Sequence, residues 1–258
     1  MKLRHLFVVL GLTCAVATQA AELKELRIGT DATYEPFEYK APDGKLVGFD
    51  IDLANALCAE MKRKCIFVES PWDGIVPSLL AKKFDLIISS MTVTDQRKKT
   101  VAFSDKITDI PYRVIVKSSS GLDGSPKSMK GKKVGVLKGS TEADFAEKYY
   151  LKAGATVHRY ESTQESYLDI VSGRIDAIIG NLVEMKIGFL SKPEGKPFEF
   201  STYELKDQAI LGYGTGAAMR KQDVQLKTAF NDALKTVRSN GSYKKIADKY
   251  FDIDVYGQ

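Results

Sequence analysis

Two segments of the sequence carry groups that could bind a carboxylate. Arg97 follows a run of hydroxyl side chains at residues 89–94, and its planar guanidinium can form two parallel hydrogen bonds to a carboxylate. The tripeptide at 139–141, Gly-Ser-Thr, stands between a strand pattern and a helix pattern, where the free N–H groups of a helix N-terminus favour anions. Taken alone, such an arginine more often belongs to a solvated basic stretch, here residues 97–99, and hydroxyl-rich strand ends are common in turns.

A second group of residues could bind a cation. Asp31 follows the first predicted strand, and Tyr34 and Trp72 offer aromatic faces, each worth roughly 0.5–2 kcal/mol to a nearby cation. Trp72 is also compatible with a core position, although Pro71-Trp72-Asp73-Gly74 is typical of a loop. Asp50 is a weaker candidate, because it could simply cap the helix that follows. A free amino acid carries both charges, and a closed cleft must pair each of them.

Metal and catalytic signatures are missing from the sequence. Outside the first 20 residues there is one histidine, His158, and Cys58 and Cys65 do not have C-x₂-C zinc spacing. There is no G-x-S-x-G, H-E-x-x-H or P-loop motif, and the glycine-rich stretch 212–216 does not match G-x-G-x-x-G. We therefore expect a binding protein that uses neither a metal nor a cofactor. An enzyme stays open as an alternative, since only geometry can establish an acid/base pair.

The first 20 residues have the pattern of a secretory signal peptide. Lys2 and Arg4 precede an apolar run at residues 6–16, and small residues surround a cleavage site after Ala20. The run is too short to span a bilayer, and a buried N-terminal helix is the less favoured alternative. Cleavage lowers the formal charge of +5 by two. The remaining excess is mild and interspersed with acidic residues, so we expect no nucleic-acid partner.

The pair Cys58 and Cys65 fits an exported protein. These are the two cysteines that remain once residues 1–20 are removed. An even pair in an exported chain is more often a disulfide than a metal site.

Short apolar strands alternate with amphipathic helices in two series, which predicts two α/β lobes with largely parallel sheets. An extended segment at 109–116 separates the series, and two helical stretches, 224–238 and 243–250, close the chain. The strands are expected at residues 26–30, 65–69, 84–88, 133–137, 156–160 and 177–179, and the helices at 51–57, 75–81, 143–151 and 166–172.

Five collinear blocks resemble the bacterial polar amino-acid-binding proteins of ABC importers. They lie at residues 27–37, 48–53, 88–97, 134–141 and 249–257, and the last one is similar to the lysine/arginine/ornithine- and histidine-binding branch. The resemblance implies a type II periplasmic-binding-protein fold, with two α/β lobes, two crossing hinge strands and the ligand in the interlobe cleft. Lobe one is then 21–109 plus 211–258, and lobe two is 112–206. It also implies a periplasmic monomer that delivers an amino acid to a membrane permease.

The resemblance also assigns roles to individual residues. It implies that Arg97 binds the ligand carboxylate from lobe one and Thr141 from lobe two, that Asp31 faces the ligand side chain, and that Cys58 and Cys65 form a disulfide. The full set of ligand-binding residues expected on this basis is Asp31, Tyr34, Trp72, Ser89, Ser90, Thr92, Arg97, Leu137, Thr141, Glu142 and Asn181.

Two positions depart from the family pattern. Asn181 stands where the family usually has an aspartate that pairs the α-ammonium, and Glu142 stands where relatives often have glutamine. If Glu142 supplies the missing charge, the ligand is a cationic L-amino acid: arginine, lysine, ornithine or histidine. Otherwise the ligand lacks a free α-amine, as an opine or a guanidino acid does. We favour the first alternative; a dehydratase-like enzyme on the same fold is the third.

Overall fold

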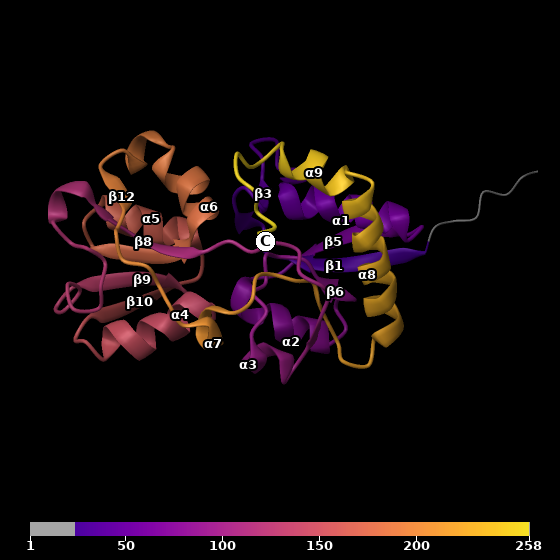
Figure 1. Cartoon of the computed structure of the whole chain (residues 1–258), viewed down its shortest axis with the longest axis horizontal. Helices are drawn as coiled ribbons and strands as arrows, with labels where there is room; N and C mark the ends of the chain where they lie inside the picture. Colours follow the sequence, from indigo (N-terminus) through magenta and orange to yellow (C-terminus); the bar gives the residue numbers. More distant parts are fainter. Residues whose placement is uncertain (1–23, 258) are drawn as a thin grey trace, which may run out of the picture.

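The computed structural model describes residues 24–257, so the predicted signal peptide, residues 1–20, lies outside the described residues. Figure 1 shows two α/β bodies side by side, each built around its own five-stranded sheet and linked by extended connections. This is the two-lobed α/β architecture that the sequence predicts. We call the body around β1 lobe one and the body around β9 lobe two.

Lobe one is built on a sheet of order β5-β1-β6-β13-β7. Its strands are β1 (Glu25–Thr30), β5 (Lys64–Glu69), β6 (Leu86–Ile87), β7 (Ala102–Phe103) and β13 (Ala218–Met219), and a small second sheet holds β2 (Thr33–Tyr34), β3 (Glu38–Lys40) and β4 (Leu46–Val47). The helices are α1 (Phe49–Glu60), α2 (Ile75–Leu80) after a 3₁₀ turn at Trp72–Gly74, α3 (Asp95–Lys98), α8 (Val224–Ser239) and α9 (Ser242–Ala247).

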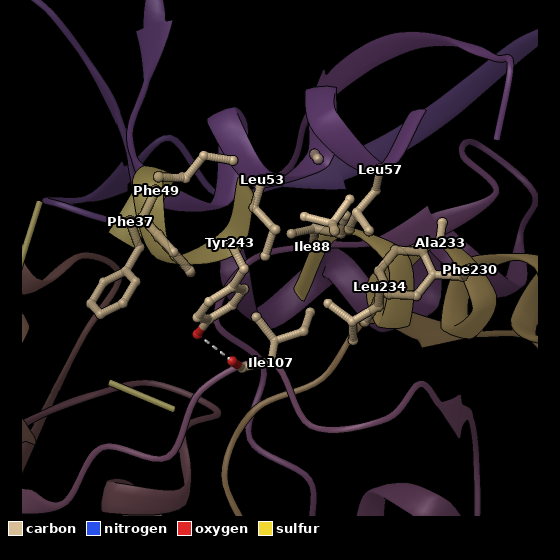
Figure 2. Close-up of a cluster of buried hydrophobic side chains, with 14 of the residues drawn as sticks. Phe37, Phe49, Leu53, Leu57, Ile88, Ile107, Phe230, Ala233, Leu234 and Tyr243 are labelled. Carbon is tan, nitrogen blue, oxygen red and sulfur yellow. Dashed lines mark hydrogen bonds between the residues drawn. The ribbon is translucent and has the colours of Figure 1, made fainter. Parts of the chain in front are cut away.

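The main core of lobe one joins the start of the chain to its end. Side chains of α1 pack against those of α8 and α9, as Figure 2 shows for Leu57, Phe230 and Leu234. Each fully buried side chain of this size contributes about 1.5–3 kcal/mol. The Tyr243 hydroxyl donates to the carbonyl oxygen of Ile107 at 2.7 Å, which ties α9 to the segment that leaves the lobe.

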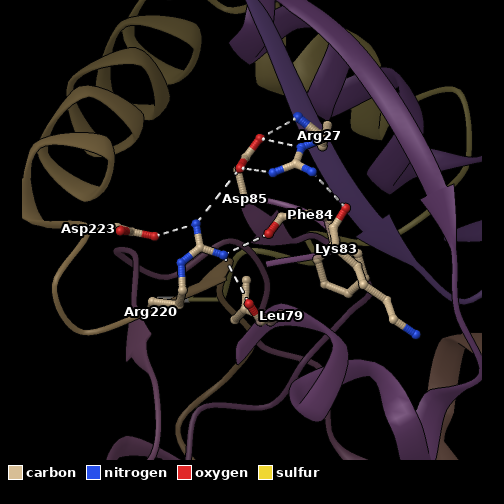
Figure 3. A network of polar contacts seen from close by, with 7 residues as sticks. All are labelled: Arg27, Leu79, Lys83, Phe84, Asp85, Arg220 and Asp223. Atoms are coloured by element: carbon tan, nitrogen blue, oxygen red, sulfur yellow. Dashed lines mark hydrogen bonds and ion pairs between the residues drawn. The ribbon is translucent and has the colours of Figure 1, made fainter. Parts of the chain in front are cut away.

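A buried arginine fixes the returning chain to lobe one. Arg220 donates to the carbonyl oxygens of Leu79 at 2.9 Å and Phe84 at 2.7 Å, and it pairs with Asp223 at 2.7 Å. Asp85 pairs with Arg27 of β1 at 2.8 Å and lies 3.8 Å from Arg220 (Figure 3). The network therefore joins β1, α2, β6 and the segment after β13.

Lobe two is built on a sheet of order β10-β9-β11-β8-β12. Its strands are β8 (Tyr112–Lys117), β9 (Lys133–Leu137), β10 (Thr156–Tyr160), β11 (Ala177–Asn181) and β12 (Phe198–Phe200). Its helices are α4 (Thr141–Phe145), which continues as a π-helix at Ala146–Leu151, α5 (Thr163–Val171), and α6 (Leu182–Met185), which continues as a π-helix at Lys186–Leu190. Two 3₁₀ turns lie at Ser118–Ser120 and Pro193–Gly195, and α7 (Gln208–Leu211) lies on the return path.

The prediction of largely parallel sheets is wrong, because both sheets are mixed. In lobe one β1 runs parallel to β5 and β6, whereas β13 is antiparallel to β6 and β7. Lobe two repeats this pattern, with β9 parallel to its neighbours and β8 antiparallel to β11 and β12. The antiparallel strands flank the two crossings between the lobes.

The two crossing segments bind each other midway between the lobes. The Ile107 amide donates to the carbonyl of Thr215 at 2.8 Å, and the Thr215 amide donates to the carbonyl of Thr108 at 2.7 Å. Two paired connecting segments of this kind form a hinge about which the lobes can rotate. The residue limits given above for the two lobes stay a prediction.

The predicted disulfide is confirmed. Cys58 near the end of α1 is bonded to Cys65 near the start of β5. Among residues 24–257, no helix has both the length and the apolar character needed to cross a membrane.

Candidate functional site

A pocket between the lobes gathers ten of the eleven ligand-binding residues expected from the sequence; the exception is Asn181. These ten are Asp31, Tyr34, Trp72, Ser89, Ser90, Thr92, Arg97, Leu137, Thr141 and Glu142, and the pocket is completed by Thr33, Glu38, Tyr112 and Ser140. Lobe one supplies the first seven, and lobe two supplies Leu137, Thr141 and Glu142. A molecule held here would therefore contact both lobes.

Arg97 is held in place by backbone groups of both lobes. It lies on the short helix α3, whose N-cap Thr94 accepts a hydrogen bond from the Arg97 amide at 3.1 Å. The guanidinium donates to the carbonyls of Thr92 at 3.0 Å and, across the cleft, Gly139 at 3.2 Å. Its carbon atom lies 5.4 Å from the ring centre of Trp72. Burial lowers the pKa of Arg97, but a guanidinium stays charged, and three of its five N–H donors remain for a ligand.

The start of α4 forms the lobe-two wall beside Arg97. Ser140 caps the helix by accepting from the Ala143 amide at 3.1 Å. The Thr141 hydroxyl lies 3.0 Å from Glu142 Oε2. Glu142 is only 6% exposed, and burial raises the pKa of its carboxyl group, while the charge of Arg97 opposes that rise. The pocket therefore places the carboxyl group of Glu142 close to the guanidinium of Arg97.

A second acidic group lies on lobe one. The Asp31 amide donates to Ser89 Oγ at 3.0 Å, and Ser89 donates to Glu38 Oε1 at 2.7 Å. Asp31 Oδ1 accepts from the amide and hydroxyl of Thr33 at 3.0 and 2.5 Å. Burial raises the pKa of Asp31.

Glu38 is the most deeply buried acidic residue that lines the pocket. It is 1% exposed, its Oε2 is fully buried, and its carboxyl group lies close enough to that of Asp50 for the two to share a proton. Burial, followed by the nearby charge of Asp50, raises the pKa of Glu38 well above its usual range. Neighbouring buried carboxylates repel each other when both are ionised, and a cation in the pocket would offset that repulsion.

Asp50 supports the site from behind. A helix cap is the alternative role that the sequence offers for it, but α1 has Gly48 as its N-cap and no side-chain capping bond. Instead Asp50 Oδ2 accepts from the amide and hydroxyl of Ser90 at 2.7 and 3.1 Å. Ser90 has a left-handed φ of 45°, a conformation that needs such support. Burial raises the pKa of Asp50 to about 6.

The structure does not bring Asn181 to this pocket. It lies at the end of β11, and its Oδ1 accepts from the amides of Val183 at 2.9 Å and Glu184 at 3.2 Å, so it caps α6. It lines a neighbouring recess at the crossing segments. The sequence held a signal for this role, because asparagine directly before a helix is a favoured N-cap.

Sequence reasoning missed Glu38 and Tyr112. The Tyr112 hydroxyl hydrogen-bonds to the Thr92 hydroxyl and lies 3.3 Å from the Thr141 hydroxyl. Burial raises the pKa of Tyr112 to about 12, so the group is a neutral hydroxyl at ordinary pH. In residues 24–257, no group of three or more His, Cys, Asp or Glu side chains is arranged to hold a metal ion.

The chain is similar to known proteins over most of its length. Residues 26–253 match the bacterial extracellular solute-binding proteins, family 3. The L-arginine-binding protein of Pseudomonas aeruginosa is 46% identical over 94% of this chain and 93% of its own. The histidine-binding periplasmic protein of Escherichia coli is 43% identical over 98% and 97%. The solved structure of an ancestral arginine-binding protein bound to arginine is 35% identical, has a TM-score of 0.81 and covers 88% of this chain and 98% of that one.

Proposed function

Since this chain belongs to family 3 of the bacterial extracellular solute-binding proteins, we propose that it captures a cationic L-amino acid for the membrane permease of an ABC importer. L-arginine is the first candidate, and lysine, ornithine and histidine follow. The protein works as a carrier and not as an enzyme: it releases its ligand unchanged. It acts in the periplasm as a monomer, after cleavage of the signal peptide behind Ala20.

The observation that carries this proposal is the charge pattern of the pocket. Arg97 and Glu142 interact with each other, and Asp31 and Glu38 form a second charged group joined through the hydroxyl of Ser89. A cationic amino acid has a matching pattern, with a carboxylate and an ammonium at one end and a second cation at the other. An anionic side chain would instead meet two buried carboxylates, at a high cost in free energy.

This pattern suggests an orientation for the ligand. Its carboxylate binds the free N–H groups of Arg97, with the hydroxyl of Thr141 on the opposite wall. Its α-ammonium pairs with Glu142, the buried carboxylate beside Arg97. Its side chain passes Tyr34 and Trp72 and places the distal cation beside the carboxyl groups of Asp31 and Glu38. Arginine and histidine, the ligands in the names of the two relatives described above, fit this description.

Ligand binding also stabilises contact between the lobes. Three ion pairs join the two lobes: Lys138–Asp73 at 2.9 Å, Lys192–Glu35 at 3.1 Å and Lys186–Asp252 at 2.8 Å. These pairs are half-exposed and contribute little each, about 0–1 kcal/mol. A bound ligand adds its own contacts to both lobes, so it shifts the population toward the closed form that a permease recognises.

The two lobes are residues 21–109 plus 211–258, and residues 112–206.

A thermal-shift screen tests the proposed function. The mature chain is stripped of bound ligand and melted with each of the common amino acids. Arginine, lysine, ornithine or histidine raises the melting temperature, because a ligand at 100 times its Kd adds about 2.7 kcal/mol of stability. Glutamate and aspartate leave it unchanged. A protein stabilised by acidic amino acids, or by none of the set, contradicts the proposal.

A further inference from the structure

Tyr112 forms part of the wall between two cavities. One is the ligand pocket, and the other is the recess at the crossing segments, which is also lined by Asn181 and Lys206. Tyr112 and Thr92 are the residues that line both. Tyr112 begins β8 and lies directly opposite Asn181 of β11 in the antiparallel register. Without the aromatic ring, the two cavities would meet next to Asn181.

The hydroxyl of Tyr112 contacts both lobes beside this wall. It hydrogen-bonds to Thr92 of lobe one and lies 3.3 Å from the hydroxyl of Thr141 of lobe two. Both threonines face the part of the pocket that also contains Arg97. Tyr112 therefore closes the end of the pocket where the α-carbon of an amino acid would lie.

The recess behind this wall offers hydrogen-bond donors that could bind an acceptor group of a ligand. Asn181 uses its Oδ1 to cap α6, whereas its side-chain NH₂ donates to none of the described residues. The ammonium of Lys206 forms an ion pair with Glu204 at 3.1 Å and is largely exposed. An amide NH₂ offers two N–H donors, which suit a carboxylate carried on an α-nitrogen substituent.

We propose that Tyr112 is a specificity-determining residue that restricts the ligand to an unsubstituted α-amine by separating the pocket from Asn181. The inference rests on the proposed function, because it takes a cationic amino acid as the ligand. The side chain of Tyr112 excludes any group on the α-nitrogen that is larger than hydrogen. Its removal opens a path from the α-nitrogen to the NH₂ group of Asn181.

Calorimetric titration with L-arginine and N²-carboxymethyl-L-arginine tests this proposal. The wild type binds L-arginine more than about tenfold more tightly than the substituted compound, because the rigid ring rejects the added group. In Tyr112→Ala this preference falls by about tenfold or more, as the carboxymethyl group enters the recess. Tyr112→Phe keeps the ring, so it keeps the wild-type preference even if both affinities fall.

A second variant identifies the partner in the recess. Tyr112→Ala combined with Asn181→Ala loses the affinity for the substituted compound that Tyr112→Ala gains, and a thermal melt of each variant checks its fold. A wild type that binds both compounds equally overturns the proposal, whatever the variants do. So does an unchanged preference in folded Tyr112→Ala. Failure of the wild type to bind L-arginine or any other cationic amino acid refutes the proposed function instead.

Discussion

Replacement of Glu38 by glutamine tests how the pocket recognises the cationic end of its ligand. The side chain is 1% exposed, its Oε1 accepts from Ser89 at 2.7 Å, and its carboxyl group lies next to that of Asp50. Glutamine has nearly the same shape, so Glu38→Gln removes the negative charge and leaves the packing in place. We expect the variant to fold and to bind L-arginine weakly.

The size of the loss follows from the buried position of the pair. A hydrogen bond to a charged group contributes about 1.5–3 kcal/mol, roughly twice the value for a neutral pair. Glutamine keeps a neutral acceptor, so about half of this free energy is lost; since every 1.4 kcal/mol is tenfold in affinity, Glu38→Gln should weaken L-arginine binding by roughly 3- to 12-fold. L-glutamine, which has no distal cation, should lose little or nothing.

Proton release gives an independent readout of the same contact. Burial and Asp50 raise the pKa of Glu38 in the free protein, and a bound cation stabilises its ionised form and lowers that pKa again. At a pH between the two values, binding therefore releases a proton, and the affinity rises with pH by up to ~tenfold per unit. Titration calorimetry in buffers of different ionisation enthalpy measures this release, which Glu38→Gln should reduce.

Glu25→Gln is a matched control, because Glu25 lies on β1 of the same lobe in an exposed ion pair with Lys64 at 3.3 Å. We expect the wild-type affinity and proton release in this control. If Glu38→Gln binds L-arginine as tightly as the control does and releases the same number of protons, our assignment of the distal cation to Glu38 is refuted.

Three further predictions concern the carboxylate partner, the disulfide and the response to pH. Arg97→Ala should lose about 2–5 kcal/mol of binding free energy, since it leaves a buried ligand carboxylate unpaired; a wild-type Kd by calorimetry, in a variant that melts normally, would remove Arg97 from the site. Replacing both Cys58 and Cys65 by alanine should cost roughly 2–3 kcal/mol of unfolding free energy; urea unfolding checks it, and an unchanged midpoint counts against a stabilising disulfide. Burial raises the pKa of Glu184 from 4.5 to about 8 although Tyr167 donates to it. Because this folded-state pKa lies above the unfolded value, the ligand-free protein should lose stability as the pH rises from about 4.5 to 8; Glu184→Gln should lose less, and equal losses in urea unfolding would contradict this.

The elements that follow local patterns could be predicted from the sequence. The apolar runs at β1, β5 and β9 and the 3.6-residue period of α1 are properties of neighbouring residues, and the structure has these elements within three residues of the expected positions. The antiparallel strands could not be predicted in the same way. β13 pairs with strands more than a hundred residues earlier, and no local pattern records such a pairing.

The same distinction between local and long-range features applies to the residues of the pocket. Arg97, Thr141 and the hydroxyl run were found because they stand in contiguous motifs. Glu38 lies in a three-residue strand, and its importance depends on Ser89, fifty-one positions away. One signal was available, since a glutamate between Phe37 and Tyr39 places a charge inside an aromatic stretch that is expected to be buried. Tyr112 gave no such signal, because its partners lie on both lobes.

A comparison of L-arginine with L-citrulline tests the central claim most directly. Citrulline has nearly the shape of arginine but carries a neutral ureido group in place of the guanidinium. Calorimetry on ligand-stripped wild-type protein should show L-arginine bound at least about tenfold more tightly, because the buried carboxylates of Asp31 and Glu38 lose their charged partner in citrulline. Equal affinities, or a preference for citrulline, would show that the pocket does not select its ligand by positive charge.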